Sequence, residues 1–202
     1  MTRMMKPTVT RRAAARTIMI SGEKVVLRAK DLSDAHDDYR WQTDLELAHL
    51  DAAPVPRVSY AQYLLAYAYQ LRISSPEHRI FAVDTPDGKH IGNCTYYNVD
   101  RRKQEAEVGL MIGERSYWDR GYGTDVIKTL VRHVFSRTKL QRLYLKTLDT
   151  NHRAQNCFTR CGFTAFGRSN HDGYNFVLME LPRQKWQIQH DRKKPSRAVA
   201  RP

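Results

Sequence analysis

EVGLMIGERSYWDRGYGTDVIKTLVRHVF, residues 107–135, combines a short apolar run, a polar connection and an amphipathic segment. The apolar run at residues 108–112 is short and closely bounded, which predicts a buried strand. From residue 126 onward, apolar residues recur at the spacing of one helix face, which predicts an amphipathic helix. Gly121 and Gly123 lie where that helix begins. The chain therefore passes from strand to glycine loop to helix.

This junction predicts a site for an anion. The first N–H groups of a helix have no partner within the helix, and the helix dipole makes that end positive. Gly121 and Gly123 carry no side chains that would keep an anion away from those amides. A P-loop requires a Gly-Lys-Ser/Thr sequence that is absent here. A dinucleotide-binding fingerprint requires a third glycine where the chain has Val126.

The same residues resemble motif A of the GNAT superfamily of N-acetyltransferases. In that motif a glutamate on a strand is followed by [QR]-x-x-G-x-[GA] at the start of a helix. Here Glu107 precedes Trp118-Asp119-Arg120-Gly121-Tyr122-Gly123. Trp118 stands where Gln or Arg is usual. The sequence Trp-x-x-Gly-Tyr-Gly resembles the form that this motif takes in the branch that contains the ribosomal-protein N-terminal acetyltransferases.

Residues 151–163, NHRAQNCFTRCGF, resemble the second GNAT signature, N-x-[RS]-A-x-x-x-[YF]-x-x-x-G-F. The resemblance covers residues 23–182. It implies a mixed α/β fold with a mostly antiparallel, twisted sheet of six to seven strands and about four helices. Two parallel strands are expected to splay apart at the cofactor. Periodicity and turn residues also predict helices at residues 31–50 and 59–73.

The resemblance implies acetyl-CoA as co-substrate and no metal. The pyrophosphate is expected on the loop residues Arg120, Gly121, Tyr122, Gly123 and Thr124. Asn151 is expected to bond the pantetheine arm. Backbone N–H groups between Gly109 and Met111 are expected to polarise the thioester carbonyl.

Glu107 is the candidate general base, and a purely structural glutamate is the alternative. Phe158 occupies the position where many family members carry a tyrosine that serves as general acid, so the acid stays open. Neutralising a lysine-like amine at pH 7 costs ~4.6 kcal/mol, whereas an α-amine costs ~1.2 kcal/mol. This difference favours an α-amine as acceptor.

The net charge of +13 is concentrated at the two ends of the chain. We predict a basic, disordered extension at residues 1–20, a GNAT domain at residues 21–183 and a basic, disordered tail at residues 184–202. The tails are either simply solvated or attracted to RNA or a ribosome.

The three cysteines contain no C-x-x-C pair, which indicates a reducing, cytoplasmic location. Cys157 and Cys161, one helical turn apart, are expected to face the core. No apolar run approaches the ~20 residues of a membrane span, so no membrane association is expected. A monomer or a homodimer is expected.

The leading hypothesis is an acetyl-CoA-dependent N-acetyltransferase. Its acceptor is a primary amine, either a protein N-terminal α-amine of the ribosomal-protein type or a small-molecule amine. The alternative is a non-catalytic, CoA-binding GNAT module tethered to RNA or a ribonucleoprotein by its basic tails.

Overall fold

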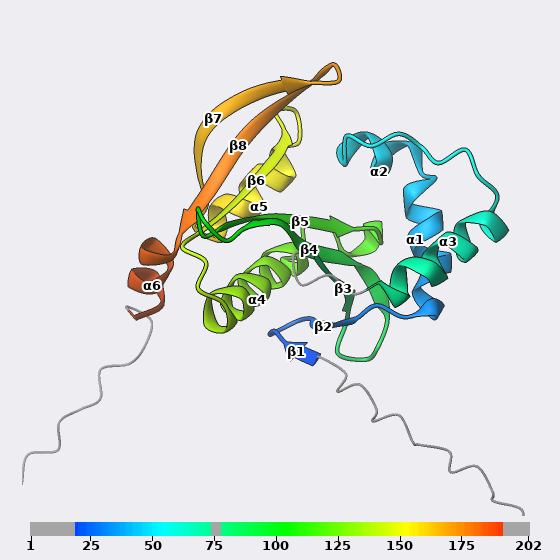
Figure 1. Ribbon diagram of the computed structural model, residues 1–202, viewed down its shortest axis with the longest axis horizontal. Coiled ribbons are helices and arrows are strands. Elements are labelled where there is room, and N and C mark those ends of the chain that lie inside the picture. The colour runs from blue at the N-terminus through cyan, green and yellow to red at the C-terminus, as the bar shows by residue number, and fades with distance from the viewer. Residues whose placement is uncertain (1–18, 74–77, 192–202) are drawn as a thin grey trace, which may run out of the picture.

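The computed structural model describes residues 19–73 and 78–191, and it contains one eight-stranded sheet (Figure 1). The strand order is β1-β2-β3-β4-β5-β6-β8-β7. The strands are β1 (Met19–Ser21), β2 (Val26–Ala29), β3 (Arg79–Asp84), β4 (His90–Asp100), β5 (Glu105–Ile112), β6 (Arg142–Leu148), β7 (Thr164–His171) and β8 (Tyr174–Pro182). All neighbouring pairs are antiparallel except β5 and β6, which confirms the predicted fold class. The strand β1, a three-residue edge strand, adds one strand to the expected number.

Six α-helices are present in the described residues, two more than expected. They are α1 (Ala35–Gln42), α2 (Leu45–Leu50), α3 (Tyr60–Arg72), α4 (Tyr122–Arg137), α5 (His152–Arg160) and α6 (Arg183–Asp191). The single helix expected at residues 31–50 is wrong, because the chain breaks between α1 and α2. Thr43 bonds back to the carbonyl of Tyr39 at 2.8 Å. Asp44 then starts α2 by accepting the N–H groups of Glu46 and Leu47 at 3.1 and 3.0 Å.

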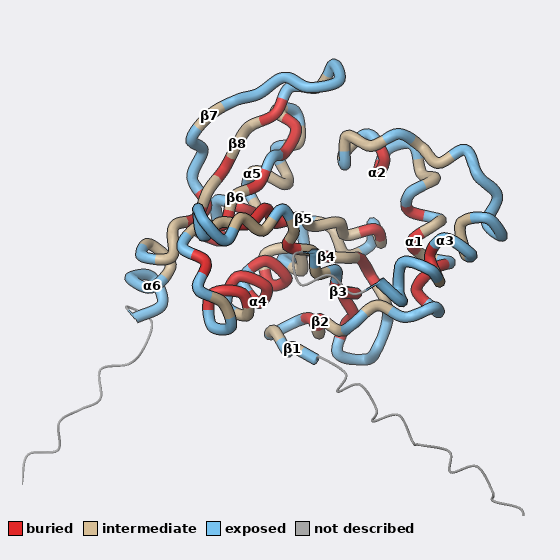
Figure 2. The backbone as a smooth tube through the Cα atoms, in the orientation of Figure 1, coloured by how far each residue is buried: buried red, intermediate tan, exposed pale blue. Residues whose placement is uncertain are grey.

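The helix α4 lies against one face of the sheet and supplies much of the core (Figure 2). Its apolar face is buried, as its periodicity predicts, and comprises Val126, Ile127, Leu130, Val131, Val134 and Phe135. On β5, Ala106 and Val108 join this core, whereas Glu107 occupies the intervening position. Because side chains alternate along a strand, Glu107, Gly109 and Met111 share the face opposite α4.

The strands β5 and β6 pair over three positions only. Glu105 pairs with Arg142, Ala106 with Leu143, and Glu107 with Tyr144, and the described residues beyond them share no further pair. Each strand remains paired with its outer neighbour, β5 with β4 and β6 with β8. The two strands therefore diverge after Glu107, as the family resemblance implies.

The helix α6 corrects the prediction that the chain is disordered from residue 184. Arg183 donates to the carbonyls of Phe135, Thr138 and Leu140 at 2.6, 2.8 and 2.6 Å. The Trp186 ring packs 5.3 Å from Phe135. These contacts hold the helix against the C-terminal end of α4. The rest of the predicted tail, and all but the end of the N-terminal extension, lie outside the described residues.

Candidate active site

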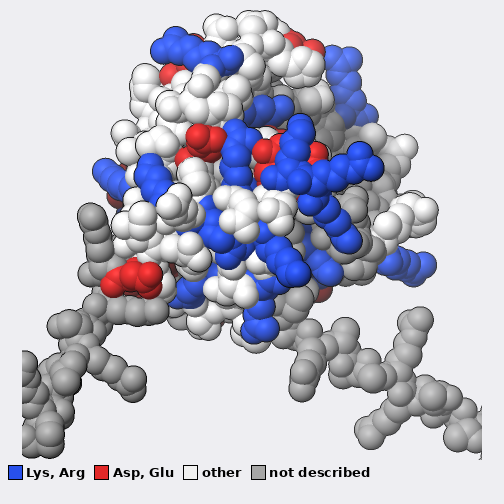
Figure 3. Space-filling model, turned by 60° about the vertical axis from the view of Figure 1, so that its left-hand side comes forward, with Lys and Arg blue, Asp and Glu red and all other residues white. Residues whose placement is uncertain are grey.

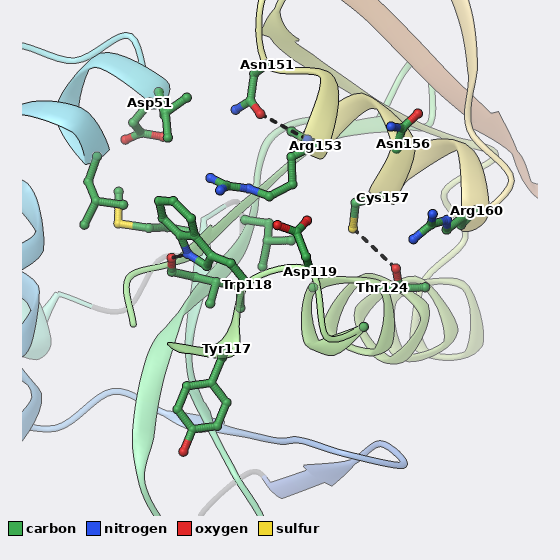
Figure 4. A pocket seen from close by; sticks show the side chains of 18 residues that line it. Asp51, Tyr117, Trp118, Asp119, Thr124, Asn151, Arg153, Asn156, Cys157 and Arg160 are labelled. Carbon is green, nitrogen blue, oxygen red and sulfur yellow. Dashed lines mark hydrogen bonds between the residues drawn. The ribbon is translucent and has the colours of Figure 1, made fainter. Parts of the chain in front are cut away.

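A cleft lies where β5 and β6 diverge (Figure 4). Its walls come from the end of β5, the loop before α4, the first turn of α4, one face of α5 and the C-terminal end of α2. The cavity volume is about 180 Å³. Residues far apart in the sequence therefore meet at the point where the parallel pairing ends.

The N-terminus of α4 opens into this cleft without a side-chain cap. Gly121 is the N-cap with φ of 83°, a left-handed conformation that glycine adopts without strain. No side chain of the described residues accepts a hydrogen bond at this cap. A Cβ at Gly123 would lie 3.3 Å from Leu110 Cδ2 and 3.4 Å from Cys157 Sγ, so a side chain would compete for the cleft. Unpaired amides on a glycine-lined surface fit a pyrophosphate.

Lys24 lies beside this loop and adds a cation to that of Arg120. It was not identified from the sequence. Its Nζ donates to the carbonyl of Arg120 at 3.0 Å. Its backbone N–H donates to the carboxylate of Asp125 at 2.7 Å, which ties the β1–β2 hairpin to α4. Tertiary contacts bring Lys24 to the loop, about a hundred residues away in the chain.

The structure brings part of the predicted cofactor set together. Gly121, Gly123, Thr124, Asn151 and Met111 line the cleft. The other three predicted residues, Arg120, Tyr122 and Gly109, are not among those that line it. Arg120 donates to the carbonyl of Ser116 at 3.1 Å, and the Tyr122 ring stacks edge-on against Tyr117 at 4.8 Å. Gly109 packs against β4, where an added Cβ would lie 2.9 Å from Thr95 Cγ2.

Asn151 begins α5 and uses one half of its side-chain amide as a helix cap. Its Oδ1 accepts the N–H of Ala154 at 3.1 Å. The amide NH₂ group is left over for the cleft (Figure 4). The predicted role of Asn151 toward the pantetheine arm therefore requires this NH₂ group as donor.

Trp118, which departs from the family pattern, positions an arginine. Its Nε1 donates to the carbonyl of Ile112 at 2.6 Å, which fixes the indole at the end of β5. The Arg153 guanidinium lies 3.4 Å from the centre of the Trp118 ring, and Figure 4 shows it reaching into the cleft. Stacking of a guanidinium on an indole is attractive. The family pattern allows an arginine at position 118, and here Arg153 of α5 brings a guanidinium to the same place.

The cysteine prediction is half wrong. Cys161 is buried, but Cys157 is only half-buried and lines the cleft beside Thr124. The Thr124 hydroxyl donates to Cys157 Sγ at 3.7 Å. A hydrogen bond from Cys161, followed by the one from Thr124, lowers the pKa of Cys157, whereas burial raises the pKa of Cys94. The Cys157 thiol is therefore more readily ionised than the Cys94 thiol.

Glu107 occupies the last paired position before the strands diverge, and it is 7% exposed. Its Oε2 accepts a hydrogen bond from Asn98 Nδ2 at 3.0 Å. Tyr97 lies directly opposite on β4, and burial, followed by the bond to Glu107, raises the pKa of its phenol. Glu107 does not line the cleft itself. A proton that leaves the cleft toward Glu107 therefore needs a relay.

Phe158 is buried in the core, where its ring packs edge-on against Phe163 at 5.8 Å. It has no proton to donate, as noted from the sequence. Tyr117 lines the cleft, but its ring packs against Tyr122. The Lys89 Nζ atom lies over the same ring, 5.2 Å from its centre. Figure 4 shows the Tyr117 hydroxyl turned away from the other labelled groups. The general acid is therefore not evident among these two residues.

Asp51 ends α2 and contributes the carboxylate of the wall across from α5. The side chain is accessible from the cleft, yet the surrounding protein raises its pKa to about 6. From the sequence, Asp51 appeared only as part of the Asp-Ala-Ala-Pro segment that ends a helix. Nothing local in that segment indicates that it faces the divergent strands.

Figure 3 shows one face on which lysine and arginine side chains predominate. No group of three or more His, Cys, Asp and Glu side chains among the described residues could hold a metal ion. Nor is any helix in the described part of the chain long and apolar enough to cross a membrane.

The chain belongs to the acetyltransferase (GNAT) domain family, whose model matches residues 24–164. A probable spermine N(1)-acetyltransferase of Bacillus subtilis subsp. natto (strain BEST195) is 25% identical over 100 residues, which cover 47% of this chain. The match spans 66% of that relative's length. The resemblance to the ribosomal-protein branch stays a prediction.

Solved structures share the fold. A spermidine N-acetyltransferase from Vibrio cholerae, in complex with CoA and spermine, has a TM-score of 0.71 at 19% identity. It covers 81% of this chain and 98% of its own. The aminoglycoside acetyltransferase AAC(6')-Ib in complex with coenzyme A has a TM-score of 0.69 at 18% identity, covering 82% and 99%.

Proposed function

We propose that this protein is an acetyl-CoA-dependent N-acetyltransferase whose acceptor is a small-molecule primary amine. The observation that carries the proposal is the uncapped N-terminus of α4 at the mouth of the diverging β5 and β6. Backbone amides at residues 121–124 receive the pyrophosphate, with Arg153 and Lys24 as nearby cations. Family membership makes acyl transfer the chemistry to test first.

When bound, acetyl-CoA supplies an activated acetyl thioester. The N–H groups of β5 that point toward β6 lose their partners after Glu107, so they are free to bond the pantetheine arm and the thioester carbonyl. Met111 lines the cleft at this level, which supports its predicted place near the carbonyl. Glu107, held by the hydrogen bond from Asn98, receives the amine proton through a relay in which the Tyr97 hydroxyl gives its own proton to Glu107 and takes another from the side of the amine.

The relatives support a small amine over a protein N-terminus as acceptor. Both the matched sequence and two solved structures of the same fold are named for polyamines or aminoglycosides. The lower cost of deprotonating an α-amine, which favoured a protein N-terminus, does not exclude such amines if Glu107 helps to remove the proton. Association of the tails with RNA or a ribosome, the cytoplasmic location and the oligomeric state stay predictions.

The test is calorimetric titration with acetyl-CoA, followed by thiol release with spermidine, an aminoglycoside and an N-terminal peptide as acceptors. We expect saturable binding and turnover with at least one small amine. Turnover with the peptide alone would favour the ribosomal-protein type of acceptor. Binding without any turnover would favour the non-catalytic module, and absence of binding would contradict the proposal as a whole.

A further inference from the structure

Asp51 is a carboxylate without a partner in the cleft wall. No hydrogen bond or ion pair reaches its side chain from the residues that the structure describes. The neighbouring acids on the same lobe are all paired: Asp44 and Glu46 with Arg115, Asp37 with Arg40, and Asp38 with Lys30. Asp51 is exposed to the cleft and unpaired among the described residues, so its carboxylate is available to accept hydrogen bonds from a cationic group of a ligand.

The cations of the cleft lie on the other wall. Arg153 is held by the Trp118 ring, and Figure 4 shows it between α5 and Asp51 without an ion pair to that carboxylate. Lys24 sits beside the loop before α4. The pKa of Tyr97 is raised by burial and by the negative charges of Glu107 and Asp51, so these two carboxylates act on one region. The arginines that line the cleft, Arg153 and Arg160, are thus on α5, and Asp51 lies on the opposite wall, at α2.

The same wall is apolar next to Asp51. Leu47 and Leu50 precede it on α2, and Met111 of β5 faces the same cleft. Such a surface suits a hydrocarbon chain that ends in a charge.

We propose that Asp51 binds an ammonium group of the acceptor other than the amine that is acetylated. Leu50 and Met111 contact the methylene chain between the two nitrogens. This inference rests on the proposed function and narrows its acceptor class to diamines and polyamines. Asp51 is in this role a specificity-determining residue and takes no part in proton transfer.

The experiment compares 1,4-diaminobutane with butylamine, which share a carbon chain and differ in the second nitrogen. For the wild type we expect kcat/KM for the diamine to exceed that for butylamine at least tenfold, mainly through KM. Asp51→Asn keeps the shape of the side chain and removes its charge. It is expected to lower kcat/KM for the diamine at least tenfold, while the butylamine values and the KM for acetyl-CoA change less than twofold.

Asp119→Asn is the matched control, because Asp119 is a second carboxylate of the same cleft, on the loop before α4. It should leave the preference for the diamine intact, and Asp51→Glu should restore part of the preference. Equal losses for both amines in Asp51→Asn would make Asp51 a base for the reacting nitrogen and overturn the inference. An unchanged preference would overturn it as well, with the proposed function intact. A wild type that binds acetyl-CoA but acetylates neither amine, nor any in the wider panel, would overturn both.

Discussion

The two walls of the cleft are built in different ways. The wall at α4 presents backbone amides, and its residues from Gly121 to Thr124 are contiguous in the chain. The wall at α2 presents the side chains of Leu50 and Asp51, which reach the cleft only through the packing of a separate lobe. A site made of backbone is defined by where glycine permits close approach, whereas a site made of side chains can change with single substitutions.

The largest expected effect comes from filling the backbone wall. Gly123→Glu places a bulky negative side chain where even a Cβ would lie 3.3 Å from Leu110 and 3.4 Å from Cys157. We expect the affinity for acetyl-CoA to fall more than 100-fold, by ~3 kcal/mol, in calorimetric titration. Lys128→Glu, an exposed position one turn further along α4, is the control and should lose far less. Equal losses in both variants would move the pyrophosphate away from the loop.

Glu107→Gln tests whether chemistry can be separated from cofactor binding. Removing a general base typically costs 10²–10⁴ in rate, and we expect kcat to fall about 100-fold. The dissociation constant of acetyl-CoA should stay within twofold, because Glu107 does not line the cleft. Asn98→Ala removes the hydrogen-bond donor to Glu107, and its kcat should lie between those of the wild type and Glu107→Gln. An unchanged kcat in Glu107→Gln would leave this residue a structural role only.

Arg153 and Trp118 should act as a unit on the cofactor side. We expect Arg153→Gln and Trp118→Leu each to weaken acetyl-CoA binding about tenfold, or ~1.4 kcal/mol. The double variant should weaken it little further, because the ring acts through the guanidinium that it holds. Trp118→Phe keeps a ring and loses the bond to Ile112, so it should retain most of the affinity. Additive losses would show that the two residues contribute independently.

The smallest expected effect concerns the stability of the α2 wall. The pKa of Asp51 is raised by burial to about 6, above the ~3.9 of an unfolded aspartate. The folded state therefore holds this proton more tightly. Ionisation of Asp51 costs stability above pH 6, and that cost disappears as the pH falls toward 4.

Asp51→Asn should consequently raise the melting temperature at pH 7.5 by only about 2 °C, because access to solvent reduces the cost. The difference should vanish near pH 4. Melting curves at the two pH values measure it. A lower melting temperature for the variant at pH 7.5 would mean that the carboxylate stabilises the fold.

The sequence predicted the backbone wall better than the side-chain wall. Glycine spacing and helical periodicity are local, so the loop and α4 could be expected from residues 107–135, whereas the divergence of the strands was expected from the family resemblance. Lys24 and Asp51 carry no local signal, because only tertiary packing brings them to the cleft. The break between α1 and α2 was missed because capping by Asp44 competes with a continuous apolar pattern. The helix α6 was missed because one tryptophan in a basic segment anchors it.

The contacts of Arg183 bear on how much chain forms one cooperative unit. The family model ends at residue 164, yet β8, which separates β6 from β7 in the sheet, lies beyond that limit. Arg183 donates hydrogen bonds to three backbone carbonyls at and just after the C-terminal end of α4. The other end of this helix opens into the cleft. A fragment trimmed to the family boundary would expose an unpaired β6 edge and the Phe135 ring. The packed unit therefore includes β8 and the first turn of α6, through Arg183 and Trp186.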